Sequence, residues 1–218
     1  MRRVVLAFAL VVLAGHSAFA QDPPPPLPRI VVDLQGLVPV FPNDSQQLAD
    51  SRPVDAVRRL SVSELPGAGW GGRAGAHVYF LKYRAMTVGI GGEVTRGTST
   101  SKPAGPSSGL VAVDERLLGI ASQVSANFGS GHGWSYLSGG IGRSRWSLHP
   151  AGAGDTVADT ESLPTANYGG GARWFAKAHL AFSLDVRLYE IQPGSSFGGR
   201  PGSPRTRLFV MGAGISLK

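Results

Sequence analysis

Five charged side chains stand inside apolar or glycine-rich stretches of this chain. If these stretches line one interior, the fold brings side chains of opposite charge together there. The five residues are Asp33, Glu93, Arg173, Asp185 and Arg187. An ion that leaves water without a partner costs several kcal/mol, so acids and arginines in such places are expected to pair. They predict a structural polar network that fills a lumen. The alternative interpretation is a gated polar pathway through the lumen.

The histidines do not have the spacing of a catalytic or metal site. Only His77 falls within a predicted strand, where it faces the interior near Tyr79. The others lie in the N-terminal segment or beside turns and loops: His16, His132, His149 and His179. No close His-x-Ser pairing points to a lipid A deacylase, and the glycine run at 89–92 lies within a strand, unlike a phosphate-binding loop. The sequence therefore predicts no enzyme, no cofactor and no metal.

The composition excludes several other classes of protein. The chain of 218 residues has no cysteine, so its stability must have a source other than disulfides, such as a closed, fully hydrogen-bonded barrel. Its net charge of +7 comes from basic residues spread along the chain, so no nucleic-acid partner is expected. After residue 20 no segment approaches the roughly 18 consecutive apolar residues of a membrane-spanning helix.

The N-terminus has the pattern of an export signal. Arg2 and Arg3 precede an apolar run over residues 4–14, and Ala18-Phe19-Ala20 offers the small-x-small site of signal peptidase. The apolar run is too short for a helical membrane anchor. We therefore predict a cleaved signal peptide over residues 1–20, a proline-rich spacer over 21–28 and a barrel domain over 29–218.

Eight segments have the alternating pattern of β-strands and are bounded by turn residues. They cover approximately residues 29–41, 70–82, 86–97, 116–128, 134–148, 166–176, 179–191 and 205–217. The connections alternate between long and short, the long ones covering 42–69, 98–115, 149–165 and 192–204. Short periplasmic turns and long extracellular loops are typical of outer-membrane barrels, so we predict an all-β fold, an eight-stranded antiparallel up-and-down transmembrane β-barrel. Helical periodicity over Gln46–Leu60 predicts a short helix in the first long loop.

The alternation sorts the side chains of each strand onto two faces. In the seventh segment Leu180, Phe182 and Leu184 share one face, and Ser183 and Asp185 share the other. A soluble lipocalin-type barrel turns its apolar face inward, whereas a membrane barrel turns it outward. Because the polar faces consist largely of Gly, Ala and Ser, which suit the narrow lumen of eight strands, we predict that the apolar faces contact lipid.

Aromatic residues gather toward the strand ends, as in the two girdles that membrane interfaces select. One set lies close to the short turns: Phe80, Tyr83, Phe128, Trp134, Tyr136, Trp174, Phe175 and Phe182. Another lies toward the opposite ends: Trp70, Trp146, Tyr168 and Tyr189. We predict a girdle from each set, with ordinary core aromatics as the alternative.

The segment NYGGGARWFAKAHLAFSLDVRLYEI, residues 167–191, resembles the penultimate hairpin of OmpA-type outer-membrane β-barrels. Such hairpins pair a glycine-rich strand that ends in an aromatic with a strand carrying a D-x-R-x-Y pattern, here Asp185, Arg187 and Tyr189. The resemblance in architecture extends over about residues 29–218 and includes OmpX-like and opacity-type barrels. It implies a barrel and no particular activity. The chain departs from many members in ending Ile215-Ser216-Leu217-Lys218, without the C-terminal aromatic that the assembly machinery reads.

These features together predict an outer-membrane β-barrel with a structural or surface-interaction role through four long extracellular loops. A narrow pore or transporter and a soluble periplasmic lipocalin-like ligand-binding barrel are the alternatives. The expected partners are outer-membrane lipid or lipopolysaccharide, the barrel-assembly machinery and an extracellular ligand of the loops. The expected location is the bacterial outer membrane, reached through a Sec-type signal peptide.

Overall fold

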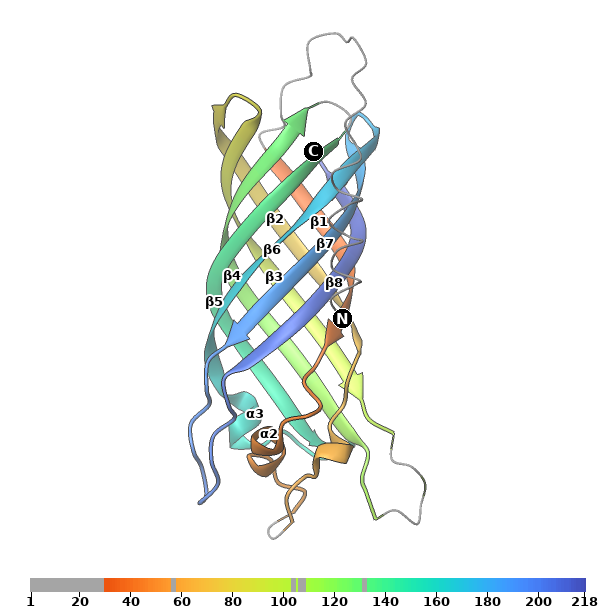
Figure 1. The fold of residues 1–218 in the computed structure, drawn as a ribbon, viewed down its shortest axis with the longest axis vertical. Coiled ribbons are helices and arrows are strands. Elements are labelled where there is room, and N and C mark those ends of the chain that lie inside the picture. The colour runs from red at the N-terminus through yellow and green to blue at the C-terminus, as the bar shows by residue number, and fades with distance from the viewer. Residues whose placement is uncertain (1–29, 56–57, 103–104, 106–108, 131–132) are drawn as a thin grey trace.

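The computed structural model describes residues 30–218 except 56–57, 103–104, 106–108 and 131–132. The predicted signal peptide and proline-rich spacer therefore lie outside the described residues. Eight antiparallel strands form a closed barrel in chain order, in which β8 pairs with β1 (Figure 1). The strands are β1 (Ile30–Val40), β2 (Trp70–Tyr83), β3 (Met86–Thr100), β4 (Val113–Ser130), β5 (Gly133–Pro150), β6 (Ser162–Lys177), β7 (Leu180–Ile191) and β8 (Thr206–Leu217). The predicted eight-stranded up-and-down barrel is confirmed.

The two ends of the barrel differ in the length of their connections. At the end that we call the turn side, two-residue turns join β2 to β3 and β6 to β7, and the C-terminus of the chain lies there (Figure 1). Arg84 has a positive φ of 54°, a backbone conformation that the commonest two-residue hairpin turns use. The opposite end, the loop side, carries the long connections. They are loop 1 (41–69), loop 2 (101–112), loop 3 (151–161) and loop 4 (192–205).

Loop 1 contains a short helix within the Gln46–Leu60 stretch, as the pattern predicts. It holds the short helix α2 (Gln46–Asp50) and the 3-10 helix η1 (Val62–Glu64), and loop 3 holds α3 (Val157–Thr160). Pro53 follows soon after α2 and lacks the N–H that another helical turn would use. Among the described residues, no helix is long and apolar enough to cross a membrane.

Apolar side chains cover the outer wall of the barrel. Ile90 and Leu184, for example, are 55% and 42% exposed. Other exposed apolar residues on this wall include Leu34, Val78, Val94, Ile120, Val124, Leu137, Ile141, Phe182 and Met211. The alternate positions of the same strands carry polar side chains that are buried in the lumen. The orientation predicted for a membrane barrel is therefore confirmed, and the arrangement of a soluble lipocalin-like barrel is not found.

Inward-facing glycines make room for large neighbours on adjacent strands. A Cβ built on Gly171 would lie 2.8 Å from the hydroxyl oxygen of Tyr136. A Cβ on Gly91 would lie 2.1 Å from the carbonyl oxygen of Ala76 and 2.7 Å from the His77 ring. Because real Cβ atoms do not approach other atoms so closely, the narrow lumen itself requires glycine at these positions.

The predicted aromatic girdles are present only in part. On the turn side the outward-facing members are exposed: Phe80, Tyr83, Phe128, Trp174 and Phe182. Trp134 and Tyr136 are instead buried in the lumen, each 4% exposed. On the loop side the prediction is wrong for Trp146 and Tyr189, which are buried in the interior, because strand alternation places them on its inward face. Only Trp70 and Tyr168 of that set are exposed.

Candidate functional site

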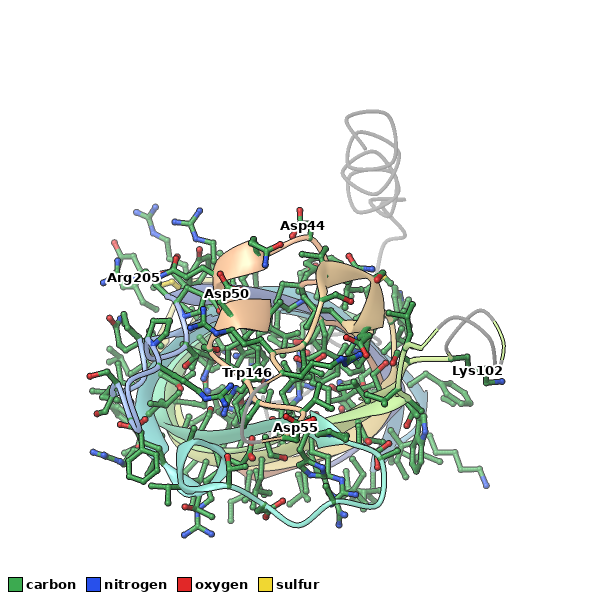
Figure 2. The ribbon with its side chains drawn as sticks, turned by 90° about the horizontal axis from the view of Figure 1, so that it is seen from below. Asp44, Asp50, Asp55, Lys102, Trp146 and Arg205 are labelled. Atoms are coloured by element: carbon green, nitrogen blue, oxygen red, sulfur yellow. The ribbon has the colours of Figure 1, made fainter. Side chains whose placement is uncertain are left out.

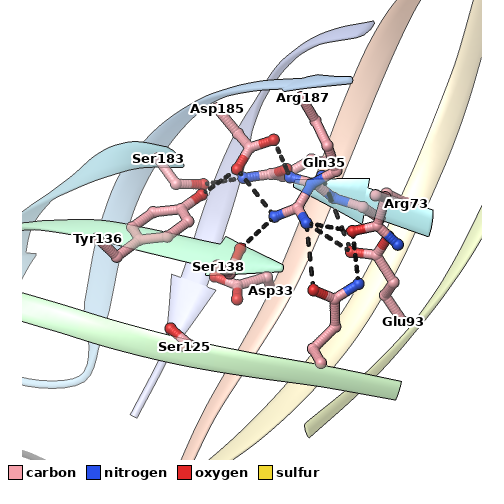
Figure 3. Close-up of polar contacts among 12 residues, drawn as sticks. Asp33, Gln35, Arg73, Glu93, Ser125, Tyr136, Ser138, Ser183, Asp185 and Arg187 are labelled. Atoms are coloured by element: carbon pink, nitrogen blue, oxygen red, sulfur yellow. Dashed lines mark hydrogen bonds and ion pairs between the residues drawn. The ribbon is translucent and has the colours of Figure 1, made fainter. Parts of the chain in front are cut away.

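The turn-side half of the lumen holds a network of paired charges (Figure 3). Arg173 donates through Nε and Nη2 to the two carboxylate oxygens of Asp33, at 3.0 and 2.7 Å. The Ser216 hydroxyl donates to the same carboxylate, and the Tyr136 ring lies 4.0 Å from the Arg173 guanidinium. A two-point contact between arginine and carboxylate combines strength with fixed geometry, so this pair holds β1 and β6 in place across the lumen.

Asp185 is a second centre of the network. Arg73 Nη2 lies 2.7 Å from Asp185 Oδ1, and the Tyr136 hydroxyl donates to Asp185 Oδ2 at 2.7 Å. Arg73 also donates to the side-chain oxygen of Gln35, whose amide donates to the Ser183 hydroxyl at 3.0 Å. These contacts link four strands, β1, β2, β5 and β7, through side chains alone (Figure 3).

Arg187 and Glu93 complete the network toward the centre of the barrel. Arg187 donates to the Ser138 hydroxyl at 2.6 Å and lies 3.4 Å from Asp185 Oδ2. Glu93 accepts a hydrogen bond of 2.9 Å from the Tyr189 hydroxyl and lies 3.8 Å from Arg187 Nη1. The acids and arginines of the network are equal in number, three of each, so its formal charges cancel.

All five residues predicted for the luminal network point into the barrel and are buried there: Asp33, Glu93, Arg173, Asp185 and Arg187. Arg173 and Asp185 lie on neighbouring strands but are not paired, because the register places Arg173 opposite Ser183. The prediction missed Arg73. This residue shares the inward face of β2 with His77, so the alternation that placed His77 inside was the signal that could have found it.

Toward the loop side the interior changes from charged to apolar. Inward-facing residues of the strands are buried here: Leu37, Leu117, Trp146, Leu208 and Val210. Residues of loop 1 join them in one core cluster: Phe41, Leu48, Ala49, Leu60 and Leu65. Seen from the loop side, Trp146 lies near the middle of the barrel mouth, with loop 1 close by (Figure 2). Packed side chains therefore close the lumen at this end.

A buried ion pair joins loop 1 to loop 3. Arg52 donates through Nη1 to Asp159 at 3.1 Å and through Nη2 to the carbonyl oxygen of Trp146 at 3.2 Å. Both charged side chains are at most 1% exposed. The indole N–H of Trp146 donates to Glu115 at 2.7 Å. The apolar core is thus surrounded by hydrogen bonds that fix the loops to the barrel wall.

Glu64 joins loop 1 to loop 2. Its carboxylate accepts from Arg58 Nη2 at 2.6 Å and from the backbone N–H groups of Val111 and Ser61, both at 2.8 Å. Burial alone would raise the pKa of Glu64, but these hydrogen bonds and the Arg58 charge hold it below its usual value. Ser61-x-x-Glu64 is a capping box, and Thr156-x-x-Asp159 forms a second one at the start of α3. That spacing is the sequence signal that could have identified both acids.

A cleft of about 410 Å³ lies between loops 1, 3 and 4. Its polar lining includes Asp55, His149, Glu161 and Arg200, and Phe197, which is 61% exposed, adds an aromatic side chain. Figure 2 shows Asp55 at this end of the barrel. No group of three or more potential metal ligands comes together in the described part of the chain.

The polar groups of the cleft are held in place by the loops that form it. Glu161 accepts from the backbone N–H and the hydroxyl of Ser195, at 2.9 and 2.7 Å. His149 Nε2 lies 3.2 Å from Asp155 Oδ1. Arg200 donates to the carbonyl oxygen of Asp55 at 3.1 Å, which connects loop 4 to loop 1. The cleft is therefore a built feature of three loops.

Ser147 and His149 combine a hydroxyl and an imidazole at the loop side. They stand at alternate positions of β5, in the reverse order of the His-x-Ser spacing considered above. His149 Nδ1 lies 3.1 Å from the carbonyl oxygen of Pro150, and Nε2 faces Asp155. Both ring nitrogens are thus directed to groups other than the Ser147 hydroxyl, so the serine is not activated in this conformation.

Comparison with known proteins places the fold. No family model matches the chain, and no curated protein matches it in sequence. The crystal structure of Neisserial surface protein A is similar, with a TM-score of 0.56 and 13% identity, and the match covers 88% of this chain and 97% of that one.

Two further structures are more distant. The outer membrane enzyme PagL matches with a TM-score of 0.45 and 12% identity, over 85% of this chain and 98% of its own. The attachment invasion locus protein Ail of Yersinia pestis, in complex with the heparin analogue sucrose octasulfate, matches with a TM-score of 0.39 and 12% identity, over 86% and 96%. At 13% identity, the likeness to Neisserial surface protein A concerns the fold alone, and it agrees with the closed barrel. This chain has the fold of the eight-stranded outer-membrane β-barrels.

Proposed function

We propose that this chain is an outer-membrane protein whose loop side binds a ligand outside the cell. The observation that supports this most is the construction of the loops. Loop 1 packs on an apolar core, and the Arg52–Asp159 ion pair joins it to loop 3. Loop 4 lines a cleft together with these two loops. Ordering a loop backbone costs about 1–2 kcal/mol per residue. A barrel that served only as a wall would have no need of such ordered loops.

The lining of the cleft indicates the kind of ligand. A volume of about 410 Å³ lies within the range of sites for small molecules or for single groups of a larger partner. Carboxylates and a guanidinium supply hydrogen bonds of both polarities, and the exposed Phe197 ring supplies an apolar face. A polar ligand with one apolar side fits this combination.

The closed loop side weighs against a pore. Trp146 and Leu117 are each 1% exposed in the apolar core that closes the mouth of the barrel. An eight-stranded barrel has an interior that side chains just fill. Recordings across planar bilayers with purified protein are expected to show no steady conductance, and a stable conductance would reopen the transport alternative.

Binding without catalysis is part of the proposal. The His149 ring faces Asp155 and Pro150 instead of Ser147, so His149 does not activate the Ser147 hydroxyl. Incubation of the folded protein with lipid A, followed by mass spectrometry, is expected to show no loss of acyl chains. Release of a fatty acid that depends on Ser147 would establish an enzyme instead.

The binding proposal is tested with the folded full chain in lipid nanodiscs on an array of defined oligosaccharides and peptides. We expect signals that are lost in Phe197→Ala and Arg200→Ala. Lys102→Ala is the matched control, because Lys102 lies on loop 2, well away from the centre of the barrel mouth (Figure 2). Signals that all three variants retain would place binding elsewhere. An array without any signal above an unrelated barrel would contradict the proposal.

Export to the outer membrane through a cleaved signal peptide and the barrel-assembly machinery is the remaining part of the proposal. The outward apolar wall supports a place in a lipid bilayer. We expect mature protein from outer-membrane fractions to begin at Gln21 and to migrate differently on gels before and after boiling. Release by osmotic shock without detergent would contradict the location.

A further inference from the structure

A shallow groove crosses the outer wall of the barrel over β1 to β5. Two adjoining hollows, of about 670 and 740 Å³, form it and share Ser122 and Ile141. Strand register explains the groove. Ala76, Gly92 and Ser122 are direct partners on neighbouring strands and form one row across the sheet, and their small side chains leave the surface low there. The rows on either side carry larger residues: Val78, Ile90 and Val124 on one side, and Val94 and Ile120 on the other. At the ordinary strand spacing of about 4.8 Å, the low floor across three strands is about 10 Å long. Val32 and Ile141 stand at its two ends in the same row.

Four outward-facing arginines stand beside this groove on its loop side: Arg96, Arg116, Arg143 and Arg145. The register sets Arg96 and Arg145 on either side of Leu118, and it sets Arg143 beside Ile120 at the edge of the groove. Strands two positions apart in a sheet are separated by about 10 Å. All four side chains are exposed.

Little within the protein neutralises this cluster. Arg116 lies 3.5 Å from Asp114, and Arg143 donates to the hydroxyl and carbonyl oxygens of Ser162. In the part of the chain that the structure describes, no other carboxylate lies within ion-pair distance of the four. Like charges on neighbouring strands repel one another, so the cluster costs stability unless an anion joins it.

Single arginines at a membrane interface are ordinary, since the long side chain reaches the head groups. This chain offers an example in Arg207 on β8, which is outward-facing and lies 3.1 Å from Glu190. The four-arginine cluster differs from Arg207 in its excess charge and in its place beside an apolar groove. Those two properties together match one class of molecule, a lipid with a phosphorylated head group.

We propose that this face is a binding site for a phosphorylated, multiply acylated lipid of the surrounding leaflet. An acyl chain would lie in the groove over Gly92 and Ser122, and a phosphate would lie among Arg96, Arg143 and Arg145. Guanidinium groups bind phosphate oxygens in pairs, with fixed geometry and strong charge-assisted hydrogen bonds. The site is separate from the cleft between the loops and does not depend on the function proposed for it.

The test uses the full chain folded in dodecyl maltoside micelles and measures retained lipid by native mass spectrometry. Wild-type protein is expected to retain lipid A and to retain enzymatically dephosphorylated lipid A poorly. The double variant Arg96→Gln/Arg145→Gln is expected to bind lipid A about a hundredfold more weakly, at about tenfold for each charged hydrogen bond lost. Arg207→Gln is the matched control and should bind as the wild type does.

The groove is tested separately with Gly92→Leu and Ser122→Leu. A Cβ on Gly92 has its nearest contact at 3.5 Å, so the added side chain fills the groove without disturbing the strand. These variants are expected to lose affinity for lipid A while they keep unboiled migration on gels. Inorganic phosphate is added as a competitor and should displace the lipid only weakly.

Three results would overturn the proposal. One is equal retention of lipid A and its dephosphorylated form. Another is an equal loss of affinity in Arg207→Gln. The third is full displacement by inorganic phosphate at the affinity of the lipid, because the groove would then contribute nothing.

Discussion

The two halves of the barrel interior are closed by opposite means. On the turn side, three arginines and three acids fill the lumen with paired charges, and on the loop side Trp146 and its neighbours fill it with apolar groups. The apolar half is covered by loop 1 and is built as a water-soluble protein builds its core. The charged half lies where the outer wall is apolar on all sides. The polarity of its luminal side chains specifies which face of each strand turns inward.

The difference teaches what each half contributes. Burial of apolar groups supplies stabilisation at about 25 cal/mol per Å². Buried ion pairs add little net stability, because the desolvation of the charges offsets their attraction. They add specificity instead, since a shift of one residue in the register would turn Asp33, Arg73 or Arg187 toward lipid.

The largest expected effect comes from breaking one ion pair in the charged half. Arg173→Ala leaves the Asp33 carboxylate buried without its partner, and the folded barrel should lose about 3–5 kcal/mol. Urea unfolding in micelles, followed by migration on gels, measures the loss. The double variant Asp33→Leu/Arg173→Met removes both charges and should recover most of the stability. A single variant as stable as the wild type would show that the network is not coupled as described.

In the apolar half, Trp146→Ala removes the largest side chain of the core and its hydrogen bond to Glu115. We expect a loss of about 3 kcal/mol, concentrated in the loops rather than in the strands. Trypsin should then cut loop 1 at Arg58 or Arg59 much faster, while the strands stay protected. Trp70→Ala is the control, because Trp70 is 73% exposed and its removal leaves no cavity. Equal proteolysis of both variants would contradict the distinction.

Substitutions of two consecutive glycines test how the crowded lumen differs from the outer wall. Gly91→Ala places a methyl group 2.1 Å from the carbonyl oxygen of Ala76, so we expect a loss of about 2 kcal/mol. Gly92→Ala points outward, where the nearest contact is 3.5 Å, and should be close to neutral. Midpoints of urea unfolding for the two variants measure the difference. Similar midpoints would mean that the lumen can relax around an added methyl group.

The smallest expected effect concerns pH and the loop side alone. The pKa of Glu64 is lower in the folded protein than in the unfolded chain, so its stabilising contribution is present at neutral pH. That contribution is lost as the pH falls through the lowered pKa. Hydrogen exchange at the Val111 N–H should therefore speed up in acid relative to amides of the barrel strands. Glu64→Gln should show fast exchange already at neutral pH and little further change.

The strands and the inward face could be predicted because alternation is a local property of the sequence. The placement of Asp33, Glu93 and Arg187 in the lumen follows from it directly. The pairing among these groups could not be predicted, because it depends on register. Arg173, for example, meets Asp33 across the barrel and not Asp185 on the next strand. The inward position of Trp146 was available from the same alternation, but its place at a strand end suggested a girdle.

The loop-side core was beyond prediction for a different reason. Leu48, Leu60 and Leu65 stand in a loop whose position no strand register fixes, and they meet Trp146 only because the barrel brings its mouth beneath them. Contacts of this kind join segments far apart in the chain. The capping boxes that end in Glu64 and Asp159 mark short helical turns, but they do not indicate which loops those acids connect.

The length of the longest hairpin sets the height of the cleft above the bilayer. β4 and β5 have 18 residues each, whereas a membrane-spanning strand needs about 9–11. The surplus of at least about seven residues per strand, at about 3.3 Å per residue, continues the ladder beyond the hydrocarbon as a rigid stalk. A large partner could therefore reach the cleft without touching the lipid head groups, and shortening this hairpin would bring the cleft down among them.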